Sequence, residues 1–321
     1  MTLAAHSEIV RISLPTPFPV GQANVFLVKG EIPLLIDAGC QVPHAYERLV
    51  SRLQENGLRV SDIGRVLLTH GHLDHAGLLA HIVKESGAET YAHPYVVQQY
   101  HSYKEGIEEN ERYLAAVMRR FGVPEEGIQR MWEARSGYAS LADQVDIQHA
   151  VTDGESVAGF TVHYVPGHSA GDVLYYNPRR RVVFSGDHLL RNISPNPLIR
   201  KPREGETRPN SLVQYQQSLR RTYALDIDLC YPGHGEPFSN HRRVIDTLLE
   251  RHERRTRETL ALLGNHVSTP HQLMLLLFPN IDVKMLHLGL SVAVGHLEIL
   301  EERNQTVAEE RDGVVYYRRR L

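Results

Sequence analysis

The stretch that decides the fold is LLTHGHLDHAG, residues 67–77, which places three histidines and one aspartate within six positions. The apolar residues before it predict a buried strand that ends at the cluster. Side chains at the end of a strand are held by rigid backbone and can converge with others on one point. Because imidazole and carboxylate groups are zinc ligands, the stretch predicts a metal site at the edge of a sheet.

Three further motifs repeat this arrangement of an apolar strand followed by a ligand-type residue. They are PGHSAGD at 166–172, VVFSGDH at 182–188 and YPGHGEP at 231–237. The predicted metal ligands are therefore His70, His72, Asp74, His75, His168, Asp187 and His234. His70 and His72 can point the same way from an extended turn, while Asp74 and His75 can address a second ion. We expect two divalent ions, with zinc first and manganese or iron as alternatives.

Composition sets limits on the class of protein. The 321 residues are 42% hydrophobic, which is enough for one large core and a second, smaller one. The net charge of −3 attracts neither nucleic acid nor an acidic membrane as a whole. No apolar run approaches the 18 or so uninterrupted residues of a membrane span, and the two distant cysteines, Cys40 and Cys230, suit reduced thiols. We therefore expect a cytoplasmic protein with no membrane partner.

Strand and helix patterns alternate through the first part of the chain, so the predicted class is α+β. A hairpin is predicted around residues 24–38, a helix over 44–57, a strand over 63–70, a helix over 77–86 and a short strand that ends at Pro94. Residues 96–142 break this rhythm with two charged amphipathic helices, which we interpret as an inserted cap. Strands resume at 160–168 and 172–187, and a helix begins near 211.

The last 80 residues predict a separate, mainly helical region. A long helix is expected over 241–264, followed by a short helix that begins with a capping box in TPHQ at 269–272, a helix pair and a hairpin with an Asp312-Gly313 turn. The predicted domains are thus a catalytic domain, 1–240, a connecting helix, 241–264, and a small domain, 265–321, whose order is that of a winged helix. Its expected recognition stretch, 290–304, is apolar and acidic, which favours packing or homodimerisation over binding of nucleic acid.

Taken together, the four motifs resemble those of the metallo-β-lactamase superfamily, whose HxHxDH signature stands here as His70, His72, Asp74 and His75. The resemblance covers roughly residues 8–240. It implies an αββα sandwich in which one metal is bound by His70, His72 and His168, the other by Asp74, His75 and His234, and Asp187 bridges both. Asp37 resembles the aspartate that supports the ligand loop in this superfamily, and an ordinary turn aspartate is the alternative.

The same resemblance implies hydrolysis by a metal-bridged hydroxide, with Asp74 as the catalytic residue that orients it. The aspartate at 187, where β-lactamases with two zincs often use a cysteine, favours the glyoxalase-II-like and ribonuclease-like branches. Asp172 stands where glyoxalase II has a histidine, which argues against hydroxyacylglutathione itself. The leading hypothesis is a small-molecule ester or thioester substrate. The alternatives are a single-strand-specific endoribonuclease and a ligand-sensing, DNA-binding regulator.

Candidate substrate-binding residues come from the basic segment after Asp187 and from the cap. Arg191, Lys201 and Arg203 are expected to meet an anionic substrate group, although a solvated charged loop explains them equally well. Tyr103 is the cap residue chosen for substrate contact. Tyr100, Tyr103 and Tyr138 are also the candidates for a general acid, and packing is the alternative for each.

Overall fold

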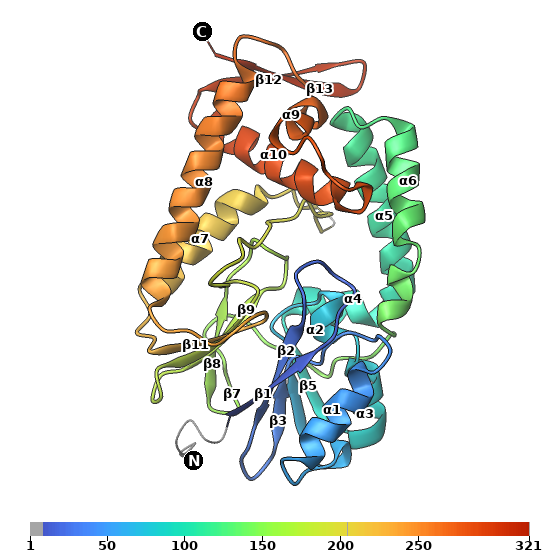
Figure 1. Cartoon of the computed structure of the whole chain (residues 1–321), viewed down its shortest axis with the longest axis vertical. Coiled ribbons are helices and arrows are strands. Elements are labelled where there is room, and N and C mark those ends of the chain that lie inside the picture. The colour runs from blue at the N-terminus through green and yellow to red at the C-terminus, as the bar shows by residue number, and fades with distance from the viewer. Residues whose placement is uncertain (1–8, 204, 321) are drawn as a thin grey trace.

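Two β-sheets packed face to face form the centre of the molecule in a computed structural model that describes residues 9–203 and 205–320 (Figure 1). The first sheet has six strands in sequence order: β1 Ile9–Leu14, β2 Ala23–Val28, β3 Leu34–Ile36, β4 Arg65–Leu67, β5 Glu89–Ala92 and β6 His149–Ala150. The second has five, in the order β11 Leu229–Pro232, β10 Val182–Gly186, β9 Val173–Asn177, β8 Phe160–Tyr164 and β7 Ser156–Val157. The hairpins predicted around 24–38 and 172–187 are both present.

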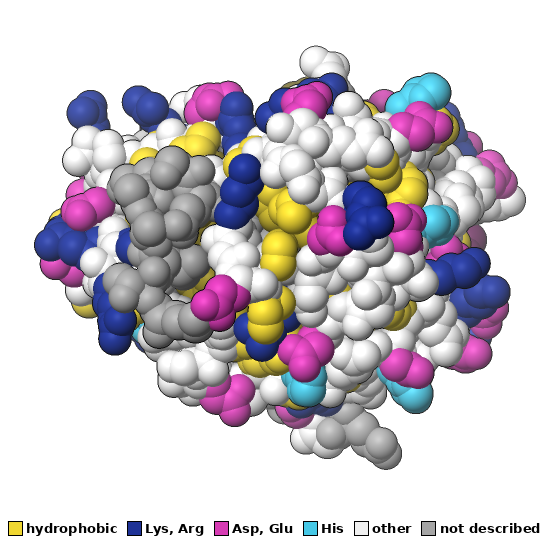
Figure 2. All heavy atoms as spheres, turned by 90° about the horizontal axis from the view of Figure 1, so that it is seen from below, with side chains coloured by type: hydrophobic (Ala, Val, Ile, Leu, Met, Phe, Trp, Pro, Cys, Tyr) yellow, Lys and Arg dark blue, Asp and Glu magenta, His cyan; other side chains and the backbone are white. Residues whose placement is uncertain are grey.

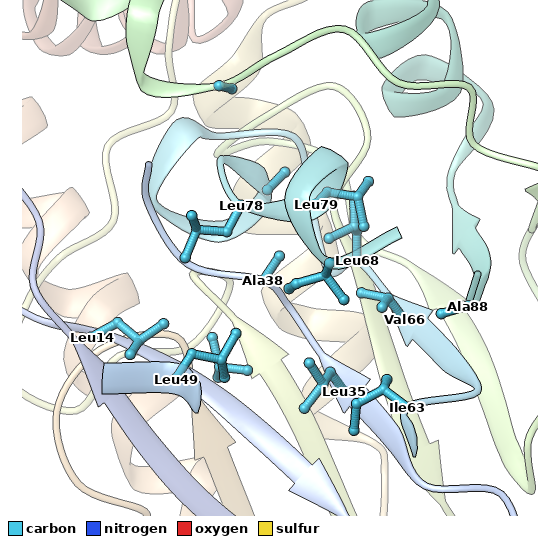
Figure 3. Close-up of a cluster of buried hydrophobic side chains, with 14 of the residues drawn as sticks. Leu14, Leu35, Ala38, Leu49, Ile63, Val66, Leu68, Leu78, Leu79 and Ala88 are labelled. Atoms are coloured by element: carbon cyan, nitrogen blue, oxygen red, sulfur yellow. The ribbon is translucent and has the colours of Figure 1, made fainter. Parts of the chain in front are cut away.

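Alternating side chains explain why the sheets form layers. In β2, Val25 and Leu27 face a core that includes residues of α1 Ala45–Gln54 and α3 Leu79–Ser86, part of which is shown in Figure 3. Phe26 and Val28 face the other way, into a core shared with the second sheet. Successive residues of a strand point to opposite faces, so β2 contributes to both cores. The outer face of the second sheet is covered by α7 Ser211–Tyr223 and α8 His241–Leu263, which completes the predicted αββα order.

The candidate ligands gather where parallel strands end. Strands β3, β4 and β5 are parallel neighbours, and so are β10 and β11. The His70–His75 motif follows β4 and contains a one-turn helix, α2 Leu73–Ala76, which the sequence reading did not predict. Asp187 and His234 follow β10 and β11. Because parallel strands end at one edge, these side chains come together there.

The predicted insertion is helical and begins slightly earlier than expected. It consists of α4 Pro94–His101, α5 Tyr103–Arg120, α6 Glu125–Arg135 and a 3-10 turn, η3 Tyr138–Leu141. A second 3-10 turn, η2 Val60–Asp62, precedes β4. The helices α5 and α6 lie along one side of the molecule and reach from the first sheet to the C-terminal region (Figure 1).

The C-terminal region has the predicted short helix and hairpin, and a 3-10 turn and one long helix stand where a helix pair was predicted. It contains α9 Pro270–Leu277, η4 Val283–Met285, α10 Leu286–Glu302 and a hairpin of β12 Thr306–Arg311 and β13 Val314–Arg319. The capping box forms, with Thr269 and Gln272 bonding each other's backbone amides. This region shares one apolar core with the insertion, in which Met118 and Met131 pack with Leu290 and Val294. The two segments are therefore one packing unit, although more than 100 residues separate them.

Helix α10 is long and rich in apolar residues. By length and composition the stretch Val283–Glu302 is able to cross a membrane, with a mean hydropathy of 1.4 over its best window. However, 67% of that window is buried inside the molecule, against α7, α8 and α9 among others. A core helix passes the same test, and its burial here explains the composition without a membrane.

Candidate metal centre

The structure brings all seven predicted ligands together at the edge of the two sheets. Three groups have their ligand atoms within 4.8 Å of one another: His70, His72 and His168; His70, His75 and Asp187; and Asp74, His75 and His234. The first and third groups are the two sets that the resemblance implied. Their common neighbour is Asp187, which lies between them.

Hydrogen bonds behind four of the histidines fix which ring nitrogen faces the centre. The Nδ1 of His168 lies 3.1 Å from the Asn196 carbonyl oxygen, and the Nδ1 of His234 lies 2.8 Å from that of Gln22. A carbonyl oxygen only accepts hydrogen bonds, so each Nδ1 carries a proton and donates it. The Nε2 atom of each neutral ring then presents a lone pair to the site, as metal binding requires.

Asp37 supports two ligands at once. Its Oδ2 lies 2.9 Å from the Nδ1 of His75, and the Thr69 hydroxyl donates to the same carboxylate over 2.9 Å. Since the Thr69 proton is used in this way, its oxygen accepts from the Nδ1 of His70 over 3.0 Å. The Thr69 amide also donates to Asp37 Oδ1. Asp37 therefore has the supporting position that the resemblance implied, and it is more than a turn residue.

The donor atoms are too close to one another for a group of neutral rings. The Nδ1 of His72 lies 3.1 Å from His70 Nε2 and 3.0 Å from His168 Nε2, and the Nε2 atoms of His75 and His234 lie 3.3 Å apart. A proton on His72 Nδ1 can be donated to only one of its two neighbours. The Nε2 lone pairs of His75 and His234 face each other, because both Nδ1 protons are used elsewhere, and they repel unless a cation lies between them. The buried Oδ1 of Asp187 also has no hydrogen-bond partner among the described residues. This nitrogen and oxygen donor set fits divalent ions such as zinc.

The electrostatics of the site point to the same need for positive charge. Burial lowers the pKa of the His75 imidazole, yet the neighbouring carboxylates, Asp187 foremost, outweigh burial and raise that pKa to about 9. Burial is likewise outweighed at His234, whose pKa rises to about 11. At His72 burial and the nearby His168 act together and lower the pKa to about 3. The carboxylates thus favour positive charge in the half that contains His75 and His234. In the half that contains His72 and His168, the His72 ring stays neutral.

Solvent reaches the set beside His72, which is half-buried, whereas the other six ligands are buried. Two backbone carbonyls in this part of the molecule accept hydrogen bonds from side chains that were not predicted from the sequence. Gln99 donates to the Gly71 carbonyl over 2.7 Å, and the Asn196 amide donates to the Leu288 carbonyl over 2.9 Å. Gly233 was also missed, although a side chain there would collide with Asp187 and His75. No pattern in the sequence marks these contacts, because each joins segments distant along the chain.

Three of the four predicted substrate-binding residues have other partners, and the fourth is exposed. Lys201 pairs with Glu109, and the Arg203 guanidinium carbon lies 3.6 Å from the centroid of the Tyr95 ring. Tyr103 is buried and donates to the Ala139 carbonyl, and Arg191 is exposed. In residues 9–203 and 205–320, none of the four forms a hydrogen bond or ion pair with a ligand side chain. Their contact with substrate remains a prediction.

Other residues considered in the sequence have structural partners. Tyr100 is buried and stacks on Tyr103, while Tyr138 lies half-buried at the end of the insertion. His93 caps α4 by accepting from the Tyr95 amide, and His188 bonds the Thr222 hydroxyl. Both cysteines, at positions 40 and 230, are free and buried, as the sequence predicted. Burial raises the pKa of the Cys40 thiol to about 12, which makes it a poor nucleophile.

Comparisons with known proteins agree with this geometry. Residues 18–234 match the family model of the metallo-beta-lactamase superfamily. A probable metallo-hydrolase of Bacillus subtilis, YqjP, is 32% identical over 97% of this chain and 98% of its own length. The crystal structure of the metallo-beta-lactamase family protein TTHA1429 from Thermus thermophilus has a TM-score of 0.82 and 27% identity, and covers 99% of this chain and 100% of its own. An atrochrysone carboxyl ACP thioesterase of Aspergillus fumigatus is 28% identical over 76% of this chain and 60% of its own length.

The two full-length matches extend through the insertion and the C-terminal region, so the whole architecture, and not the sandwich alone, has counterparts in these proteins. Neither match assigns a substrate. With the superfamily match over most of the catalytic region and the convergence of its motif residues, the chain belongs to the metallo-beta-lactamase superfamily and is a metal-dependent hydrolase.

Proposed function

We propose that this hydrolase binds two divalent metal ions, zinc first among them, and cleaves a small-molecule ester or thioester. The observation that carries the proposal is the position of Asp187. One of its oxygens lies 3.4 Å from His75 Nε2, and the other lies 3.6 Å from His168 Nε2 and 3.5 Å from His234 Nε2. A carboxylate that lies within 3.6 Å of histidines from both halves of a ligand set would be suited to bridging a pair of ions.

Metal ions bound in such a set lower the pKa of water to about 7 and polarise the carbonyl oxygen of a substrate. The residues of this chain have other tasks. The imidazoles of His70, His75, His168 and His234 are oriented by the groups behind them, so that little reorganisation is needed during the reaction. Asp74, 3.3 Å from His234 Nε2, orients the attacking water by accepting a hydrogen bond from it. Water adds to the acyl carbon and the thiol or alcohol leaves, so the products are a carboxylic acid and that thiol or alcohol.

Two observations support an ester or thioester over a phosphodiester. The curated relative from Aspergillus fumigatus is named a thioesterase, and its similarity covers 76% of this chain. The stretch expected to act as a recognition helix, 290–304, lies mostly in α10, which is buried along most of its length. We infer that the region 265–321 is a winged-helix module used for packing. Figure 2 shows the opposite end of the molecule from the C-terminal region, and basic and acidic side chains are interspersed on that face.

The test is thiol release from a panel of acyl-coenzyme A and acyl-pantetheine thioesters by metal-loaded protein. We expect turnover that chelators abolish, with about two metal ions per chain by elemental analysis. His72→Ala and Asp187→Ala are expected to lose turnover while they keep the far-UV circular dichroism of the wild type. A protein that holds two metals and cleaves single-stranded RNA but no thioester would replace this proposal with the endoribonuclease alternative.

A further inference from the structure

A half-buried arginine without an acidic partner lies at the rim of the metal centre. Arg135 is the last residue of α6, and its guanidinium forms no ion pair within the part of the chain that the structure describes. The nearest carboxylate that acts on its charge is Glu111, which is exposed and does not contact it. Burial of an unpaired cation is unfavourable, so such a residue is uncommon unless something else supplies the negative charge.

Aromatic groups hold the Arg135 guanidinium in place. Its carbon lies 5.1 Å from the ring centroid of Tyr138 and 5.9 Å from that of Trp132. One terminal nitrogen lies 2.8 Å from the Nδ1 of His287, at the beginning of α10. Because a guanidinium only donates, His287 is the acceptor and is neutral. The arginine is therefore fixed by one hydrogen bond and two ring faces, and its other nitrogens have no hydrogen-bond partner among the described residues.

Two short chains of contacts place this arginine beside the ligand set. On one side Asn196 joins the C-terminal region to the site, since it donates to the Leu288 carbonyl and accepts from the His168 ring. On the other side the Tyr138 ring packs edge-on against Phe18, with centroids 5.4 Å apart. Phe18 belongs to the loop between β1 and β2, whose Gln22 carbonyl accepts from the His234 ring.

The half-buried ligand His72 belongs to the same set as His168, to which the contacts through Asn196 lead. His287 and His72 are close enough for the charge of one to affect the other. His72 is also the ligand through which solvent reaches the set. A substrate whose carbonyl group lies at the metal ligands therefore extends past His72 toward Arg135.

We propose that Arg135 binds an anionic group of the substrate, a carboxylate or a phosphate, at the open side of the metal centre. The inference rests on the proposed ester or thioester hydrolysis and names the substrate class more narrowly: an acyl thioester with a negative charge away from the scissile bond. Planar guanidinium groups form paired hydrogen bonds with carboxylate and phosphate oxygens. The insertion supplies the arginine, and the C-terminal region supplies the histidine that orients it.

The test compares wild type with Arg135→Gln, Arg135→Lys and a control, Arg119→Gln. Arg119 lies on the same insertion but pairs with Glu125, so its charge is already compensated. Three thioesters separate the sources of charge: acetyl-pantetheine is neutral, acetyl-coenzyme A carries phosphates on the thiol side, and succinyl-pantetheine carries a carboxylate on the acyl side. Metal-loaded protein is used throughout, and thermal melting checks that each variant is folded.

We expect Arg135→Gln to raise KM for a charged thioester about tenfold or more with kcat nearly unchanged, and to leave the neutral substrate unaffected. Arg135→Lys restores part of the loss, and Arg119→Gln stays within about twofold of wild type. An effect on acetyl-coenzyme A alone assigns the anion to phosphate, and an effect on succinyl-pantetheine alone assigns it to carboxylate. Equal losses on charged and neutral substrates overturn the proposal, because they show a structural role.

A binding measurement separates this proposal from the proposed function. Titration calorimetry with inorganic phosphate and with succinate is carried out on the same four metal-loaded proteins. If no thioester is cleaved but anion binding is weakened only in the Arg135 variants, the anion site stands and the reaction is a different one. If neither anion binds differently to wild type and Arg135→Gln, and KM is also unchanged, the anion site is refuted whatever the substrate.

Discussion

Asp37 and His75 form a buried pair in which a carboxylate oxygen of Asp37 lies 2.9 Å from the Nδ1 of His75, on the side of the ring that faces away from the other ligands. The same carboxylate accepts from Thr69, which in turn accepts from His70. Asp37, which is not itself a predicted metal ligand, therefore orients ligands that belong to both halves of the centre.

From this relationship, Asp37→Ala is expected to weaken metal binding about 10- to 100-fold, because the rings of His70 and His75 lose the groups that fix their orientation. Competition with a chromophoric chelator measures the change. Asp62→Ala is the control, since Asp62 is an aspartate that pairs with Arg59 on an exposed turn. Equal metal affinity in wild type and Asp37→Ala would refute the supporting role.

Gly233→Ala is expected to reduce turnover about 100-fold by displacing ligands. A Cβ atom at this position would lie 2.4 Å from Asp187 Oδ1 and 2.7 Å from His75 Cε1, and neither group can move without leaving the centre. Metal content and kcat are the measurements. Gly106→Ala in α5, where a Cβ meets nothing within 4 Å, is the matched control. A fully active Gly233→Ala enzyme would mean that the ligand set tolerates this displacement.

Arg208→Ala is expected to destabilise the fold by about 3–5 kcal/mol. Arg208 pairs with Glu298, a buried residue of α10 whose carboxyl pKa burial raises, so the substitution leaves a buried acid without its partner. Denaturant unfolding measures the change. Replacing both residues, as Arg208→Met with Glu298→Leu, is expected to recover most of the loss. The exposed pair of Arg59 and Asp62 serves for comparison, and Arg59→Ala is expected to change the stability far less than Arg208→Ala does.

His296 is expected to make the protein less stable in acid. Burial and the neighbouring His252 lower its pKa from 6.5 to about 3, and its Nδ1 lies 2.8 Å from the Thr256 hydroxyl. The unfolded chain therefore takes up the proton first as pH falls. The stability due to the neutral ring is present above pH 6.5 and is lost between there and about pH 3, at about 1.4 kcal/mol per pH unit.

The Thr256 hydroxyl donates to the His252 carbonyl and so accepts from the His296 Nδ1. The substitution His296→Asn keeps a donor near Thr256 but does not titrate. The free energy of unfolding, measured by denaturant at several pH values between 6.5 and about 4, is expected to fall less steeply in this variant than in wild type. His266→Asn alters an exposed histidine and serves as the control. Parallel curves for wild type and His296→Asn would show that the ring is protonated in the folded state as readily as in the unfolded one.

Local patterns were sufficient to predict much of the sandwich and the ligand set. Strand β8 follows from alternating apolar residues and β10 from a short apolar run, and the ligands follow from dense motifs placed directly after strands. The one-turn helix α2 was missed because its four residues are too few to show a helical period. The roles of Asn196 and Gln22 were also missed, since backbone carbonyls carry no mark in the sequence.

The C-terminal region shows a different limit of sequence reasoning. Its short helix and hairpin were predicted, because the capping box and the Asp312-Gly313 turn are local signals. Its partner was not, because the contact between Met118 and Leu290 depends on how two distant amphipathic helices pack. Arg135 was missed for the same reason, as its position matters only once α6 lies against the beginning of α10.

The core shared by the insertion and the C-terminal region also sets the order in which the molecule is completed during synthesis. The strands that carry the ligands precede residue 235, whereas the apolar side of α5 and α6 finds its partners only after α10 and β13 have left the ribosome. The sandwich can therefore assemble before the insertion has packed against the C-terminal region. A chain that stops short of α10 would carry every metal ligand and an exposed apolar surface, making it a target for chaperones and proteases.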